Sequence, residues 1–190
     1  MKPLNLHKIS GLNEIDVCQG VKLRPLYQSD ATRILEILAA DKSIRDKVTV
    51  ASRLHTPKDI AIEIEHYRKD LGLIRYVLLK ENNPIGLISL WRDDGFFGTS
   101  PNPNDYGFGY FLDPHERGKG LITLAVQSLM KTTAGNFHVR QFVAFCEDRN
   151  HESIAVLTKL GFKPTDKTFV EPDHGWVERK YVKPNGRNKL

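Results

Sequence analysis

The chain contains 190 residues, of which 40% are hydrophobic and 27% are charged, and its formal net charge is +5. This length predicts one domain with its own hydrophobic core, and the composition excludes an intrinsically disordered chain. No apolar run approaches the ~18 residues of a membrane-spanning helix, and residues 1–20 lack the apolar core of a signal peptide. We therefore expect a cytoplasmic protein that does not enter a membrane.

The first half of the chain predicts a strand, two helices and a β-hairpin, in that order. Ser29-Asp30 and Thr56-Pro57 are typical helix starts, because each precedes residues with helical apolar spacing. Asn82-Asn83 suits the tight turn between two apolar runs. The expected elements are strands at 21–25, 73–79 and 84–91 and helices at 31–38 and 57–72, with a polar connection at 41–55.

The most informative stretch is residues 106–130, with the sequence YGFGYFLDPHERGKGLITLAVQSLM. Its aromatic strand ends at Asp113-Pro114, because proline has no amide proton to continue a strand ladder. In the loop Arg117–Gly120, two glycines let the backbone approach a ligand, two cations lie beside them, and the amides of residues 121–124 open a helix. The stretch predicts an anion cradle, and pyrophosphate is the expected anion. An anionic ligand also explains part of the net charge better than a nucleic acid does.

The rest of the chain predicts a strand, a helix and two final strands. Asn150 is the expected N-cap of the last helix, and Gly161-Phe162 is a typical helix end followed by an apolar contact. The expected elements are a helix at 121–135, a strand at 137–145, a helix at 150–161 and strands at 162–170 and 175–182. The turn-rich residues 95–105 are interpreted as an exposed loop that lines a cleft.

Several other kinds of site are excluded by spacing. Cys18 and Cys146 stand far apart without a CxxC or Cys/His pattern, so neither a disulfide framework nor a zinc site is indicated. Cys146 is interpreted as a buried thiol, because no histidine lies beside it in sequence. His151-Glu152 begins like a zinc-binding helix, but Ala155 stands where the second histidine is needed. The cradle matches neither a Walker loop nor a Rossmann loop, since Thr123 replaces the third glycine.

Three motifs occur in a fixed order, namely GYFLDP, RGKGLIT and NHESIAVLTKLGF. Together they resemble the GNAT family of acetyl-CoA-dependent N-acetyltransferases, and more narrowly its RimJ/RimL-type branch, which acetylates ribosomal-protein N-termini. The resemblance covers residues 20–182 and implies an α/β (α+β) GNAT fold. In that fold a mixed, mostly antiparallel sheet of six to seven strands splays at the cofactor site and is flanked by about four helices. We accordingly expect a leader at 1–20, an acetyltransferase domain at 21–182 and a basic tail at 183–190.

The resemblance also implies how acetyl-CoA is held. The amides of residues 117–123 would bind its pyrophosphate, and the backbone of residues 110–112 would pair with its pantetheine arm like an added strand. Asn150 and Ser153 would line the thiol end. The implied cofactor-binding residues are Tyr110, Phe111, Leu112, Arg117, Gly118, Lys119, Gly120, Leu121, Ile122, Thr123, Asn150 and Ser153.

The implied chemistry is direct attack of an amine on the thioester, without an acetyl-enzyme. An ammonium group cannot attack, so a base must take its proton, and a donor must stabilise the departing thiolate. Ser153 is the expected thiolate partner and Glu171 the preferred base. Alternative bases are Asp173 and His174 between the last strands and Asp105 and Tyr106 on the aromatic strand.

Three positions depart from the family pattern. Leu157 stands where many GNAT proteins have a tyrosine that acts as general acid, so this role passes to Ser153 or to no residue. Gly107 stands where the branch often has glutamate, which argues against a carboxylate base at that point. Ile122 replaces glycine or alanine at little cost, because the backbone amide does the binding.

The leading hypothesis is an enzyme that transfers acetyl from acetyl-CoA to a primary amine, with a protein N-terminus as the preferred acceptor. The alternatives are a small-amine acetyltransferase for polyamines or antibiotics and a catalytically silent acyl-CoA-binding protein. A nucleic-acid-binding module is a third hypothesis, based on the pI of 9.2, and predicts only weak binding that salt abolishes. No metal is expected, and the sequence leaves open whether the chain forms a homodimer.

Overall fold

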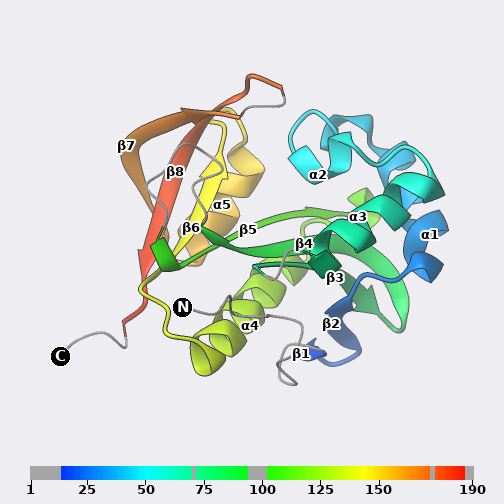
Figure 1. Cartoon of the computed structure of the whole chain (residues 1–190), viewed down its shortest axis with the longest axis horizontal. Helices are drawn as coiled ribbons and strands as arrows, with labels where there is room; N and C mark the ends of the chain where they lie inside the picture. Colours follow the sequence, from blue (N-terminus) through cyan, green and yellow to red (C-terminus); the bar gives the residue numbers. More distant parts are fainter. Residues whose placement is uncertain (1–13, 70–71, 94–101, 172–173, 187–190) are drawn as a thin grey trace.

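The computed structural model describes residues 14–69, 72–93, 102–171 and 174–186. It contains one eight-stranded sheet with helices on both faces (Figure 1). The strands are β1 (Ile15–Cys18), β2 (Val21–Pro25), β3 (Leu73–Lys80), β4 (Asn83–Asp93), β5 (Asn102–Leu112), β6 (Gln141–Cys146), β7 (Lys163–Val170) and β8 (Val177–Pro184). The α-helices are α1 (Ala31–Ala40), α2 (Thr49–Ser52), α3 (Pro57–Lys69), α4 (Leu121–Asn136) and α5 (His151–Lys159).

The sheet has the order β1-β2-β3-β4-β5-β6-β8-β7. Every neighbouring pair is antiparallel except β5 and β6, which are parallel. The predicted α/β class and mostly antiparallel sheet are therefore confirmed. The sheet has eight strands rather than six to seven, because β1, inside the predicted leader, pairs with β2. Four residues are too few to show a period, which explains why the sequence did not predict this strand.

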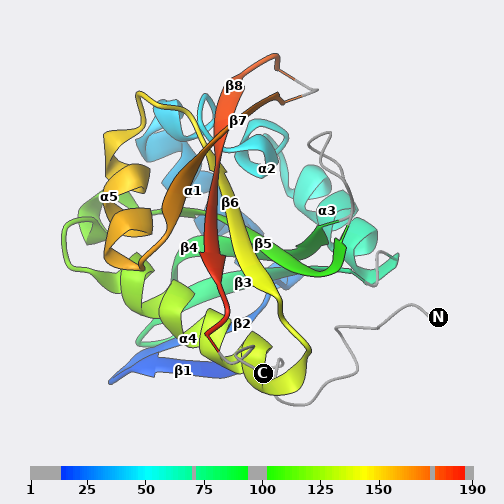
Figure 2. The ribbon, with the colours of Figure 1, turned by 90° about the vertical axis from the view of Figure 1, so that its left-hand side faces the viewer.

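The helices divide between the two faces of the sheet (Figure 2). On one face α4 and α5 pack against an apolar cluster that includes Tyr76, Phe108 and Leu157. On the other face α1 and α3 cover a second cluster that includes Val77, Leu87 and Phe111. The middle of β4 is buried on both faces, so its apolar run is continuous instead of alternating. The helix α2, a single turn within the predicted polar connection, was not expected.

The sheet separates along the line between β5 and β6. Their parallel pairing runs over Asp105–Gly107 and Gln141–Val143 and stops there. β4 continues to pair with β5 as far as Leu112, and β8 continues to pair with β6 as far as Cys146. The two halves of the sheet therefore keep their own ladders while the gap between β5 and β6 opens. This is the splay that the sequence predicted.

Some predicted features lie outside the described residues. These are residues 1–13 of the expected leader, residues 95–101 of the expected loop, Asp173, and residues 187–190 of the expected tail. Among the helices that the structure describes, none is long and apolar enough to cross a membrane.

Candidate active site

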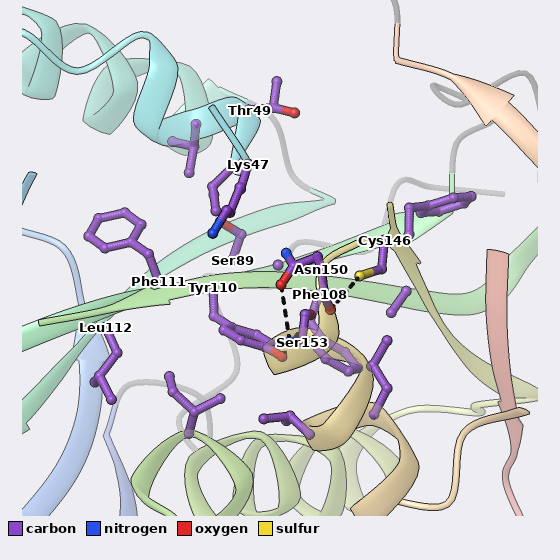
Figure 3. A pocket seen from close by; sticks show the side chains of 18 of the residues that line it. Lys47, Thr49, Ser89, Phe108, Tyr110, Phe111, Leu112, Cys146, Asn150 and Ser153 are labelled. Carbon is purple, nitrogen blue, oxygen red and sulfur yellow. Dashed lines mark hydrogen bonds between the residues drawn. The ribbon is translucent and has the colours of Figure 1, made fainter. Parts of the chain in front are cut away.

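A cavity of about 1030 Å³ occupies the gap where β5 and β6 separate (Figure 3). Its walls come from the last residues of β5 and β6, the start of α4, the helix α5, and the segment around α2. Cavities of this size suit a whole small-molecule ligand rather than a few waters. All of the predicted cofactor-binding residues except Lys119 line it, so the fold brings together positions from three separate motifs.

The cradle lies at the start of α4, as predicted. Gly118 and Gly120 have φ angles of +76° and +75°, a conformation that favours glycine, and a Cβ atom on either would meet nothing within 4 Å. Gly120 is the N-cap of α4 and offers no capping side chain, so the first-turn amides of residues 121–123 are left for a ligand. Open space beside free amides at a helix N-terminus fits a pyrophosphate.

The two cations of the cradle already have carboxylate partners. Arg117 Nη2 lies 2.8 Å from Asp41 Oδ2, and Lys119 Nζ lies 3.0 Å from Glu116 Oε2. Lys119 also donates to the carbonyl of His115, away from the cavity lining. The arrangement therefore assigns anion binding to the backbone more than to the lysine, although both cations keep the local potential positive.

The strand β5 presents an open edge to the cavity. Since its pairing with β6 ends at Gly107, the β6-facing backbone of residues 108–112 borders the gap, while β4 occupies the other edge. Tyr110, Phe111 and Leu112 line the cavity there. An extended ligand arm can add to such an edge in the way a strand does, and the predicted pantetheine contact fits this edge.

A polar cluster from β5 and α5 lies at the centre of the cavity (Figure 3). Asn150 caps α5, with its Oδ1 accepting a hydrogen bond from the Ser153 amide at 3.2 Å. The hydroxyl oxygens of Ser153 and Tyr110 lie 3.0 Å apart, and burial raises the pKa of Tyr110. The sequence predicted only a backbone role for Tyr110. No signal in the sequence fixes the rotamer that brings its hydroxyl to Ser153.

Cys146 borders this cluster as a protonated thiol. Burial, more than the neighbouring charges, raises its pKa to about 11. At neutral pH such a thiol is a weak nucleophile, which agrees with its interpretation as a buried small side chain.

The preferred base, Glu171, lies outside the cavity lining of the described chain. Its side chain is 0% exposed, and Oε2 accepts hydrogen bonds from the His174 amide at 2.8 Å and from His174 Nδ1 at 2.9 Å. The alternatives are placed no better. Asp105 is held by Arg140 and Gln141, and Tyr106 stacks on Phe137 with ring centroids 5.5 Å apart.

A carboxylate that the sequence analysis overlooked does line the cavity. Glu178 on β8 is only 8% exposed, and burial together with the charges of Glu171 and Glu147 raises its pKa to about 7. The signal available in the sequence was a glutamate within the strand predicted at 175–182. Across the described residues, no cluster of three or more His, Cys, Asp or Glu could hold a metal ion.

Comparison with known proteins now identifies the family. Residues 21–163 match the model of the acetyltransferase (GNAT) domain. The chain belongs to the GNAT acetyltransferase family. It is 32% identical over 153 residues to the ribosomal-protein-serine acetyltransferase of Escherichia coli (strain K12), covering 78% of this chain and 82% of that protein.

Solved structures of acetyltransferases share the fold. The structure of RimL, a ribosomal L7/L12 alpha-N-protein acetyltransferase in complex with coenzyme A, has a TM-score of 0.76 at 17% identity and covers 90% of this chain and 97% of its own. The microcin C7 self-immunity acetyltransferase MccE, in complex with acetyl-CoA and AMP, has a TM-score of 0.72 at 18% identity, with coverages of 89% and 94%. This GNAT protein is an acetyl-CoA-dependent N-acetyltransferase, and acetyl-CoA is its co-substrate.

The structure explains why this acetyltransferase has glycine at position 107. Gly107 pairs with Trp91 on β4, and the indole ring occupies the space above it. A Cβ atom at Gly107 would lie 2.3 Å from Trp91 Cε2. Trp91 lines the cavity, so an aromatic ring borders it next to Gly107.

We predict that Gly107→Ala lowers the free energy of unfolding by about 1–3 kcal/mol, the usual cost of overpacking. Gly109→Ala is the matched control on the same strand, because its Cβ would meet Trp91 at an ordinary 3.7 Å. Urea unfolding followed by circular dichroism measures both variants. Equal stability of the two would contradict the close contact between Gly107 and the indole.

Proposed function

We propose that the acceptor of this acetyltransferase is the N-terminal α-amine of a protein, of the ribosomal-protein type. The observation that carries the proposal is the 32% identity to a ribosomal-protein-serine acetyltransferase across most of both chains. Similarity over 153 residues extends well beyond the three cofactor motifs.

The charges in the cavity support a peptide acceptor. Lys47, Arg53 and Arg92 line it from the segment around α2 and from β4, and the acidic residues Asp93, Glu147, Glu152 and Glu178 line it as well. In Figure 3 the Lys47 side chain extends into the cavity. A peptide N-terminus presents a single ammonium group and then neutral amides, which suits a wall of mixed charge. A polyamine or aminoglycoside brings several cations, which basic side chains such as Lys47, Arg53 and Arg92 would repel.

In this proposal, separate residues bind the cofactor and stabilise the leaving thiolate. Amides of residues 117–123 hold the pyrophosphate, and the open edge of β5 holds the pantetheine arm, so that the reactive thioester reaches the cluster at Ser153. The Ser153 hydroxyl donates a hydrogen bond to the departing sulfur. Position 157 cannot supply this donor, because it is occupied by the buried apolar residue Leu157 instead of a tyrosine. Phe111, Leu112 and Leu157 add apolar side chains to the walls of the cavity.

The proposal is tested with acetyl-CoA and a panel of acceptors, namely short peptides with free N-termini, polyamines and aminoglycosides. We expect at least one peptide to give a kcat/KM about tenfold or more above every polycation, and the same peptide with a blocked N-terminus to be inert. Release of free thiol and the mass of the product measure the reaction. A polyamine or aminoglycoside as the best acceptor would replace the proposal by a small-amine function. Tight coenzyme A binding with silence across the panel would favour a non-catalytic protein.

A further inference from the structure

Glu178 lines the cavity from β8. The next residue, Arg179, pairs in register with Cys146 at the end of β6, which places Glu178 beside the end of that strand. Glu178, Cys146, Ser153 and Tyr110 all line one cavity, so the buried carboxylate of Glu178 shares this space with the Ser153 cluster.

We propose that Glu178 is the general base that takes the proton from the acceptor ammonium group. The N–H bond of the ammonium breaks, an O–H bond forms on the Glu178 carboxylate, and the nitrogen keeps the electron pair. The neutral amine then attacks the thioester carbonyl carbon, and the C–S bond breaks with its electron pair going to sulfur. Sulfur takes up the second proton of the nitrogen, with the Ser153 hydroxyl beside it, and Glu178 returns its proton to solvent. The step depends on a primary amine as acceptor and not on which amine it is.

The surroundings of Glu178 suit this role. Burial first, and then the negative charges of Glu171 at the end of β7 and Glu147 after β6, favour its protonated form. The nearby cation on the same strand, Lys180, lies 3.6 Å from Asp93 Oδ2 and is paired with it. Arg179 points to the opposite face, where it binds Asp148. A base with a pKa of about 7 is partly ionised at neutral pH and can both accept and release a proton there.

Glu171 is then a positioning residue for Glu178. Its backbone closes the β7–β8 turn, since its amide donates to the Trp176 carbonyl at 2.8 Å and its carbonyl accepts from the Gly175 amide at 2.8 Å. Its carboxylate binds His174 within the same turn and adds negative charge near Glu178. Through the turn it fixes the start of β8, and through its charge it sets the pH range of the base.

The test compares pH profiles of Glu178→Gln and Glu171→Gln, measured with any primary amine that the wild-type enzyme acetylates. For the wild type, kcat/KM should rise with pH through about 7, because the carboxylate is the active form. Glu178→Gln should lower kcat/KM at neutral pH about 100-fold and remove this rise. Glu171→Gln should keep the rise but move it to lower pH, because a negative charge near Glu178 is lost. Glu36→Gln, which changes an exposed residue on α1, is the control for effects of mutagenesis and purification that do not involve the cavity.

A second measurement needs no acceptor. In enzyme labelled with ¹³C at the glutamate carboxyl groups, one carboxyl should titrate near pH 7, and its signal should be missing in Glu178→Gln. Glu178→Asp, which keeps the charge but shortens its reach, should retain the rise with reduced kcat/KM. The coenzyme A dissociation constant should stay within about twofold in each variant. Loss of both activity and pH dependence in Glu171→Gln, with Glu178→Gln fully active, would overturn the proposal, as would titration of Glu178 below pH 5.

Discussion

Gly120→Val is expected to raise the coenzyme A dissociation constant at least tenfold, which corresponds to about 1.4 kcal/mol of binding free energy. Gly120 is exposed, lines the cavity and stands at the N-cap of α4 with a φ angle of +75°. The space that an added side chain would enter is empty in the protein, so the clash arises only with a bound pyrophosphate. Isothermal titration calorimetry with coenzyme A measures the change.

The backbone strain of this substitution needs its own control, because a β-branched residue is disfavoured at positive φ wherever it stands. Gly20, in the turn between β1 and β2, has a φ angle of +72° and does not line the described cavity. Gly20→Val should therefore lose similar stability while keeping the affinity for coenzyme A. Unchanged affinity in Gly120→Val, or an equal loss in Gly20→Val, would contradict the position of the pyrophosphate site.

The cofactor side of the site was predictable because its signals are local in sequence. Glycines with positive φ, a proline that ends β5 and an N-cap asparagine each depend on a few neighbouring residues. The splay of the sheet was implied by the resemblance to the GNAT family, and the structure confirms it through the short pairing of β5 with β6. Local signals thus sufficed to place the glycine loop at the start of α4 and the N-cap of α5.

The catalytic side was harder to predict because its contacts join residues that are far apart in sequence. Tyr110 and Ser153 are 43 residues apart, and their hydroxyls meet only because β5 and α5 flank one cavity. The choice between Glu171 and Glu178 depends on which side of the β7–β8 hairpin faces that cavity. A shift of one residue in strand register would exchange the two faces of the hairpin. The alternation of buried and exposed residues that would reveal the register is weak in β7, where most residues are exposed.

Gly107 illustrates a third kind of limit. On sequence alone, glycine at this position indicates only that a carboxylate is absent. The structure shows that the Trp91 indole occupies the space that a side chain at position 107 would enter. The pair cannot be recognised without the register between β4 and β5. The same strand places Arg92, next to Trp91, in the cavity lining.

Ser153→Ala is expected to lower kcat about 100-fold and to leave the coenzyme A dissociation constant within about twofold. The hydroxyl is removed from beside Tyr110, so the departing sulfur loses its hydrogen-bond donor in the transition state. The fold of α5 is preserved, because Asn150 caps the helix through the backbone amide of residue 153 and not through its hydroxyl. Steady-state kinetics and calorimetry separate the two effects.

Two further variants make the result specific to the Tyr110–Ser153 pair. Tyr110→Phe should lower kcat by about tenfold, less than Ser153→Ala, because it removes the partner that orients the serine hydroxyl at 3.0 Å but leaves the hydroxyl itself. Thr158→Ala, an exposed change on the same helix, should leave kcat unchanged. If Ser153→Ala reduces turnover and coenzyme A affinity equally, Ser153 binds the cofactor rather than stabilising the leaving thiolate. If Tyr110→Phe is fully active, the serine acts without its neighbour, and the position of its hydroxyl is then set by the helix alone.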